Sequence, residues 1–149
     1  MDRQTEAGGK VKTYAPLFST LIDSSVWGES KEVRILWITM LAKKDKNGLV
    51  ESTLPGLARA AVLTLEECEG ALAILESPDP HSRTPDNKGI RVRQVLDGWL
   101  VLNHAKYRDM MQSMRNESRR EYKRQWMEMK RKAKKAVRQT SDESTEPTK

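Results

Sequence analysis

Cysteine is almost missing from this chain, which excludes disulfide-stabilised folds and the common zinc sites. Cys68 is the only cysteine among 149 residues, so no disulfide can form within the chain. Histidine is scarce too: only His81 and His104 occur, and no cysteine or histidine stands at metal-ligand spacing from another. His81 shares a loop with Asp79 and Asp86, a set too small to favour a metal site. We expect no metal, no other cofactor and no oxidising compartment.

Long apolar runs are also missing. No stretch approaches the ~20 residues that a membrane span needs, and residues 1–12 lack the apolar core of a signal peptide. Hydrophobic residues make up 37% of the chain and charged residues 32%, a balance that predicts one modest core with extensions. The sequence therefore predicts a soluble, cytoplasmic protein without membrane contact.

Signatures of catalysis are absent as well. Gly8-Gly9 is the nearest approach to a phosphate-binding loop, and it lacks the other residues of one. Cys68 falls on the apolar face of a predicted helix, where a thiol packs rather than reacts. We therefore predict that the protein is not an enzyme.

Positive charge gathers in the last third of the chain. Residues 1–107 contain 14 Lys/Arg and 14 Asp/Glu, whereas residues 108–149 contain 13 and 7 and so carry the whole net charge of +6. Between Arg115 and Arg138 there are 11 basic residues and only three glutamates. A neutral body with a basic extension is typical of phosphate binding, and a helix that only adds solubility is the alternative.

Hydrophobic periodicity predicts a helical first part. We expect a short helix over 14–27 and a second helix that is capped by Ser30 and runs to about Lys43. A short strand at 49–51 follows. Ser52 is expected to cap a third helix.

A fourth helix and a hairpin complete this part. The helix is predicted to begin at a capping box in which Thr64 and Glu67 satisfy each other's backbone N–H groups. Asp97-Gly98 is typical of a two-residue hairpin turn. The paired strands are expected at 90–96 and 99–102.

The order of these elements predicts a mainly α fold with a small β-hairpin, namely a winged helix-turn-helix domain over 13–107. The short strand would join the hairpin as a third strand. A long helix is expected from Tyr107 onward, with a basic amphipathic part over 108–138. The polar leader at 1–12 and the tail at 139–149 are expected to be disordered.

Residues 57–72 match the helix-turn-helix register position by position. A wider resemblance over 14–125 is carried by VRILWITMLAKKDKNGLVESTLPGLARAA, SPDPHSRTPDNKG and DGWLVLNHAKYRD. Through these stretches the chain resembles small winged-helix proteins of tailed bacteriophages and, more distantly, the N-terminal winged helices of replisome-organiser proteins. The resemblance implies DNA binding in replication initiation or a related step, in the host cytoplasm.

The second helix of the helix-turn-helix departs from the DNA-reading pattern. It carries Glu66, Glu67 and Glu69 where such a helix faces base edges, and Val62 occupies the turn where many of these motifs have glycine. Carboxylates repel phosphates. We therefore expect these three glutamates to bind a protein partner, such as a helicase or its loader, or the motif to serve as a scaffold.

Two groups of basic residues are candidates for nucleic-acid contact, with a solvated face as the alternative in each case. Those near the hairpin are Arg83, Lys88, Arg91 and Arg93. Those of the long helix are Arg115, Arg119, Arg120, Lys123, Arg124, Lys130, Arg131, Lys132, Lys134 and Lys135.

We predict a protein that binds DNA, double-stranded rather than single-stranded, mainly through its phosphates. An apolar stripe along the long helix, which includes Trp126, is available to pack on the domain or to pair with a second copy in a homodimer. Two other functions stay open. One is a dimeric transcriptional regulator that reads an operator, and the other is a protein-interaction adaptor whose basic tail binds RNA or an acidic partner.

Overall fold

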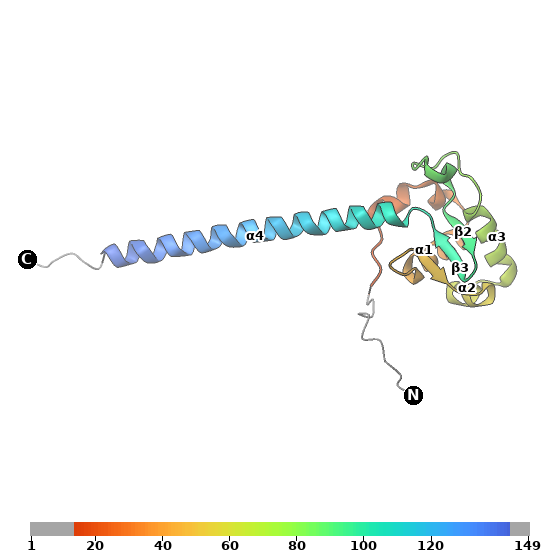
Figure 1. The fold of residues 1–149 in the computed structure, drawn as a ribbon, viewed down its shortest axis with the longest axis horizontal. Coiled ribbons are helices and arrows are strands. Elements are labelled where there is room, and N and C mark those ends of the chain that lie inside the picture. Colours follow the sequence, from red (N-terminus) through yellow and green to blue (C-terminus); the bar gives the residue numbers. More distant parts are fainter. Residues whose placement is uncertain (1–13, 144–149) are drawn as a thin grey trace, which may run out of the picture. The chain divides into compact units, whose positions relative to one another are not determined.

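The computed structural model describes residues 14–143, so the predicted leader at 1–12 and the end of the predicted tail, 144–149, lie outside the described residues. The chain divides between Ala105 and Lys106 into two compact units. It is mainly helical, with three N-terminal helices, a three-stranded antiparallel sheet and a long C-terminal helix, an order consistent with a winged-helix layout (Figure 1).

Two α-helices of the first unit, the first and the third, begin where the sequence predicts them. Ser30 caps the first α-helix, and the capping box of Thr64 and Glu67 is present at the start of the third. The helices and strands of this unit are α1 (Lys31–Lys43), β1 (Leu49–Glu51), α2 (Leu54–Ala61), α3 (Leu65–Leu75), β2 (Val92–Val95) and β3 (Gly98–Val101).

The cap of α2 is Thr53 rather than the predicted Ser52. The Thr53 hydroxyl accepts a hydrogen bond from the N–H of Gly56 at 3.2 Å. Ser52 instead follows the last residue of β1, and its own N–H donates to the carbonyl of Asp97 in the hairpin turn at 3.2 Å. Helix α2 therefore begins one residue later than the sequence indicates, directly after the contact with the hairpin.

The segment before α1 is not the single helix predicted over 14–27. It forms two 3-10 helices, η1 (Ser19–Asp23) and η2 (Ser25–Gly28). Ser24 between them is extended, with φ −85° and ψ 154°, and its hydroxyl donates to the carbonyl of Leu21 at 2.7 Å. Serine side chains that bond nearby backbone groups compete with α-helical hydrogen bonding, and apolar spacing does not reveal this competition.

The hairpin and the short strand form one sheet, as the sequence predicts, and the strand order in that sheet is β1-β3-β2. The turn differs from the prediction by one residue: Val95 pairs with Gly98, so Leu96 and Asp97 make the turn. Gly98 is required inside the strand. Its φ is +149°, and a Cβ there would lie 2.0 Å from the carbonyl oxygen of Val50.

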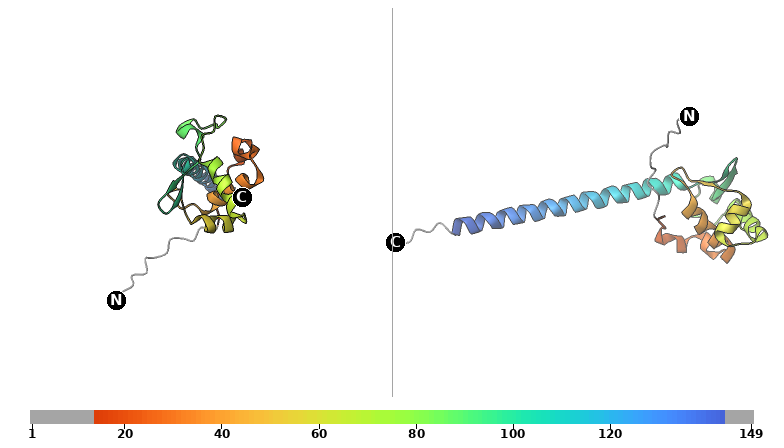
Figure 2. Two further views of the ribbon diagram at one scale, coloured as in Figure 1. Left: turned by 90° about the vertical axis from the view of Figure 1, so that its right-hand side faces the viewer. Right: turned by 90° about the horizontal axis from the view of Figure 1, so that it is seen from below.

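The core of the first unit lies between its three helices and the sheet (Figure 2). Helix α3 contacts both α1 and α2. Burial raises the pKa of the Cys68 thiol, and the charge of Glu69 raises it further, so this thiol is protonated and packed. Fully buried side chains come from the three α-helices of this unit and from two strands: Val33, Leu36, Met40, Val50, Leu57, Cys68, Leu75 and Val92.

Helix α4 runs from His104 to Glu143 and is longer than its predicted basic part at 108–138. It includes residues 139–143, which the sequence predicted to be disordered. No proline or glycine lies between His104 and Pro147, and their absence from this stretch allows the extension. Across the residues that the structure describes, no helix combines the length and the apolar character needed to cross a membrane.

Val62, in the turn between α2 and α3, is held in the left-handed conformation with φ 56° and ψ 45°. Its side chain is 89% exposed, so packing does not offset the steric cost of a β-branched residue there. We expect Val62→Gly to raise the free energy of unfolding by about 1 kcal/mol, measured by urea denaturation.

The matched control is Ala60→Gly, an exposed position inside α2. There the same new residue should lower the free energy of unfolding by about 1 kcal/mol, because glycine is a poor helix former. A Val62→Gly variant that unfolds at lower urea than the wild type would show that the turn is not strained.

Candidate nucleic-acid and partner surfaces

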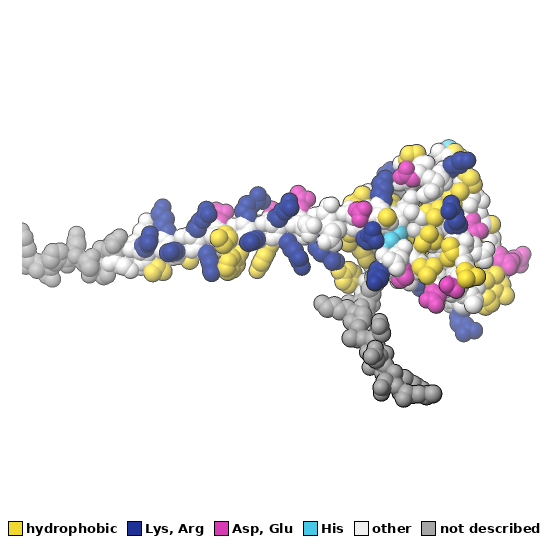
Figure 3. Space-filling view, in the orientation of Figure 1, with side chains coloured by type: hydrophobic (Ala, Val, Ile, Leu, Met, Phe, Trp, Pro, Cys, Tyr) yellow, Lys and Arg dark blue, Asp and Glu magenta, His cyan; other side chains and the backbone are white. Residues whose placement is uncertain are grey.

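The basic residues of α4 concentrate on one side of the helix. All 11 between Arg115 and Arg138 are exposed, and Figure 3 shows Lys and Arg side chains along the length of α4. At about 100° per residue, nine of them fall within an arc of about 160° and a length of about 30 Å. This basic face consists of Arg119, Arg120, Lys123, Arg124, Lys130, Arg131, Lys134, Lys135 and Arg138. The predicted residues Arg115 and Lys132 lie outside it.

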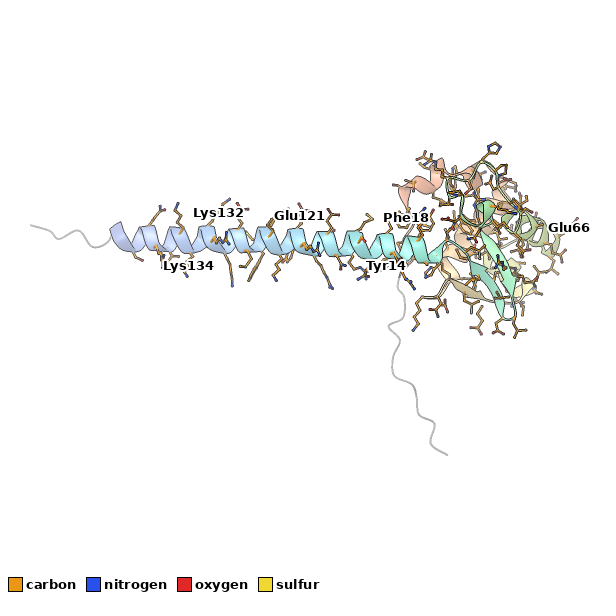
Figure 4. All side chains as sticks on the ribbon, turned by 45° about the horizontal axis from the view of Figure 1, so that its top comes forward. Tyr14, Phe18, Glu66, Glu121, Lys132 and Lys134 are labelled. Atoms are coloured by element: carbon orange, nitrogen blue, oxygen red, sulfur yellow. The ribbon has the colours of Figure 1, made fainter. Side chains whose placement is uncertain are left out.

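The three glutamates of this segment do not interrupt the basic face. Glu117, Glu121 and Glu128 fall together along one of its borders by the same helical geometry. Glu128 pairs with Lys132 at 3.1 Å, and Glu121 lies 3.8 Å from Arg124 (Figure 4 labels Glu121 and Lys132). Exposed pairs of this kind contribute less than about 1 kcal/mol, so they leave the basic residues available to a polyanion.

The predicted apolar stripe is exposed on the side of α4 away from the centre of the basic face. Tyr122 is 71% exposed and Trp126 is 41% exposed. The ammonium of Lys130 lies 4.2 Å from the centre of the Trp126 ring, a cation–π contact. The stripe therefore offers aromatic and thioether surface beside cationic groups.

Near the hairpin, Arg91 differs from the other predicted basic residues because its side chain is bonded within the first unit. Its guanidinium lies 3.0 Å from the carboxylate of Asp79 and 2.7 Å from the hydroxyl of Ser25, and its side chain is only 11% exposed. Arg91 lies one residue before β2, which begins at Val92, whereas Arg93 lies within that strand. Exposed basic residues that remain here are Arg83, Lys88 and Arg93.

Asp79 is the centre of this buried cluster. Burial alone raises its pKa, but hydrogen bonds from Ser25, the His81 N–H and Arg91, together with the Arg91 charge, outweigh burial and hold the pKa below its usual value. The cluster ties the segment before α1 to the loop before β2. Within residues 14–143, no group of three or more His, Cys, Asp or Glu side chains is arranged to hold a metal ion.

The acidic residues of α3 have two different roles. The carboxylate of Glu67 accepts from the N–H of Thr64 at 2.9 Å and so caps its own helix. Glu66 and Glu69 are exposed, and Glu66 is labelled in Figure 4. Leu65 in the first turn is also half exposed. The start of α3 therefore presents negative charge with some apolar surface.

A groove of about 410 Å³ lies between α3 and the hairpin, and the sequence did not predict it. The Trp99 indole N–H donates to the Glu76 carboxylate at 3.0 Å across it. Leu96 at the turn is 98% exposed; an apolar residue in a turn was the one available signal. The lining residues are Ser52, Thr53, Leu54, Glu69, Leu72, Ala73, Glu76, Gln94, Val95, Leu96, Gly98 and Trp99.

Comparison with known proteins does not place the chain in a family. No protein-family model, no curated protein and no solved structure matches the chain.

The Asp79 cluster gives a pH-dependent prediction. We expect Asp79→Asn to lower the free energy of unfolding by about 2 kcal/mol at neutral pH, because it removes the charge that Arg91 and Ser25 bond. Since the folded pKa of Asp79 is lowered, its contribution is complete above the unfolded pKa of about 3.9 and is lost as the pH falls through the folded value.

Urea denaturation of wild type and variant over a range of acidic pH checks this sign. The difference between them should shrink below about pH 4. Asp86→Asn, an exposed carboxylate of the same loop, is the control and should change stability by less than about 0.5 kcal/mol. A difference that stays constant as the pH falls would contradict the assigned role of Asp79.

Proposed function

We propose that this protein binds double-stranded DNA through phosphate contacts made by the basic face of α4. The supporting observation is that nine exposed Lys and Arg side chains share one face without an intervening carboxylate. Duplex DNA carries about one charge per 1.7 Å of axis, so a stretch of duplex as long as this face carries more phosphates in total than the face has cations. Affinity would then be electrostatic and largely independent of sequence.

The first unit would act as a winged helix-turn-helix in which α2, the turn at Val62 and α3 form the motif and β2–β3 forms the wing. Glu66 and Glu69 oppose the use of α3 as a major-groove reader, because they would meet phosphates with like charge. The exposed Arg93 of the wing is better suited to a second phosphate contact. Sequence-specific operator reading is accordingly the weaker proposal.

A role in replication initiation follows from the sequence resemblance to phage winged-helix proteins, and it is part of the same proposal. A protein of this kind would hold duplex DNA through α4 while its first unit contacts another protein. The groove beside α3 favours that adaptor activity as the second candidate function, because its lining includes two carboxylates and no Lys or Arg.

The basic face is tested by a salt series with a random-sequence duplex. Each phosphate contact contributes about 0.9 to the slope of log affinity against log salt. The triple variant Arg120→Gln, Lys123→Gln, Lys134→Gln removes three cations of the face and should reduce the slope by about 2 to 3, measured by fluorescence anisotropy.

The matched control removes the same charge away from the basic face, with Arg108→Gln, Arg115→Gln and Lys132→Gln. It should change the slope by less than about 1. Equal losses in both triple variants would mean that net charge alone drives binding and that the face has no special role. No detectable binding by the wild type near physiological salt would overturn the proposed function.

A further inference from the structure

We propose that the groove between α3 and the hairpin is a docking site for a short segment of another protein, one that carries an apolar side chain flanked by Lys or Arg. This activity is separate from DNA binding, since it uses residues of the first unit alone. The argument rests on the floor of the groove, its exposed apolar wall and the sign of its charge.

The floor of the groove is already formed. Trp99 is 4% exposed and Leu72 is 6% exposed, so both are fixed by the core beneath them. The only polar atom of the Trp99 ring is satisfied by Glu76 at 3.0 Å. Because so little of the floor itself is accessible, the apolar surface that an incoming side chain covers comes mainly from the residues above it, Ala73, Val95 and Leu96. The rigid floor leaves no unpaired donor, and little ordering of the protein is needed.

The hairpin supplies an apolar wall that has no function in the fold. Leu96 in the turn is 98% exposed, although turn positions usually carry polar residues, and Val95 at the end of β2 is 36% exposed. Leu96 adds nothing to the core of the first unit and keeps its apolar surface in water. Its position at the rim of the groove gives an incoming apolar side chain a second contact.

Charge selects the class of partner. The groove is lined by Glu69 and Glu76, and no Lys or Arg is among its lining residues. Glu66, one turn before Glu69 on α3, adds a further exposed carboxylate. Nucleic acid and acidic peptides are disfavoured by repulsion, whereas a segment with Lys or Arg beside its apolar anchor gains complementary charge. The small size of the groove predicts a weak, transient complex.

The test uses the full chain and a random peptide library as the probe. Selection at physiological salt should enrich peptides with an apolar residue and net positive charge. Selected peptides should shift the NMR signal of the Trp99 indole N–H, which lies inside the groove. Glu69→Lys and Leu96→Ser should each weaken binding by about tenfold or more.

Two matched controls keep the outcome specific. Glu29→Lys changes an exposed glutamate and Val62→Ser an exposed apolar residue, neither of which lines the groove, and both should leave peptide affinity unchanged. The basic-face triple variant should also bind the peptides normally, and Glu69→Lys should retain DNA binding. A failure of peptide binding can therefore be distinguished from a failure of DNA binding.

Three results would overturn the proposal. One is a selection that yields no peptides, or yields only neutral or acidic ones. Another is that Glu69→Lys leaves the affinity for the selected peptides unchanged, or that these peptides do not shift the NMR signal of the Trp99 indole N–H. The third is self-association of the wild type that Glu69→Lys abolishes, because a second copy of this chain would then be the occupant.

Discussion

The antiparallel pairing of β1 with β3 is the contact on which the rest of the first unit depends. It joins segments that lie far apart in the sequence, and it is possible only because Gly98 has no side chain to meet the carbonyl of Val50. The hydrogen bond from Ser52 to Asp97 continues the pairing as far as the start of α2. The hairpin is therefore held beside α2 and α3, and the groove exists because of that placement.

The two candidate surfaces differ in how they are built as well as in charge. The groove takes its shape from a packed floor and from long-range contacts, so a single core change would alter it. The basic face needs only a continuous helix, because its nine cations follow from sequence spacing. One surface is suited to selecting a side chain, and the other is suited to holding a polymer of repeated charge.

Local signals in the sequence were sufficient for much of the fold. Ser30 and the Thr64–Glu67 capping box act within one helical turn, so helix starts could be predicted from them. Contacts between distant segments could not be predicted. Arg91 alternates like a surface residue, and only the folded chain brings Asp79 and Ser25 to it. The groove could not be predicted from the sequence either, because its lining residues come from three separate stretches of the chain.

The crowding of like charges on α4 affects the helix itself. Along the basic face, Arg119 and Lys123, Arg120 and Arg124, and Lys130 and Lys134 are each four residues apart, a spacing at which like charges weaken helical structure. Dissolved ions relieve this repulsion even as they compete for phosphates. A rise in ionic strength therefore stabilises the helical state of α4 and at the same time weakens its binding to phosphates. A bound polyanion also favours the helical state, because it neutralises the charges that repel one another.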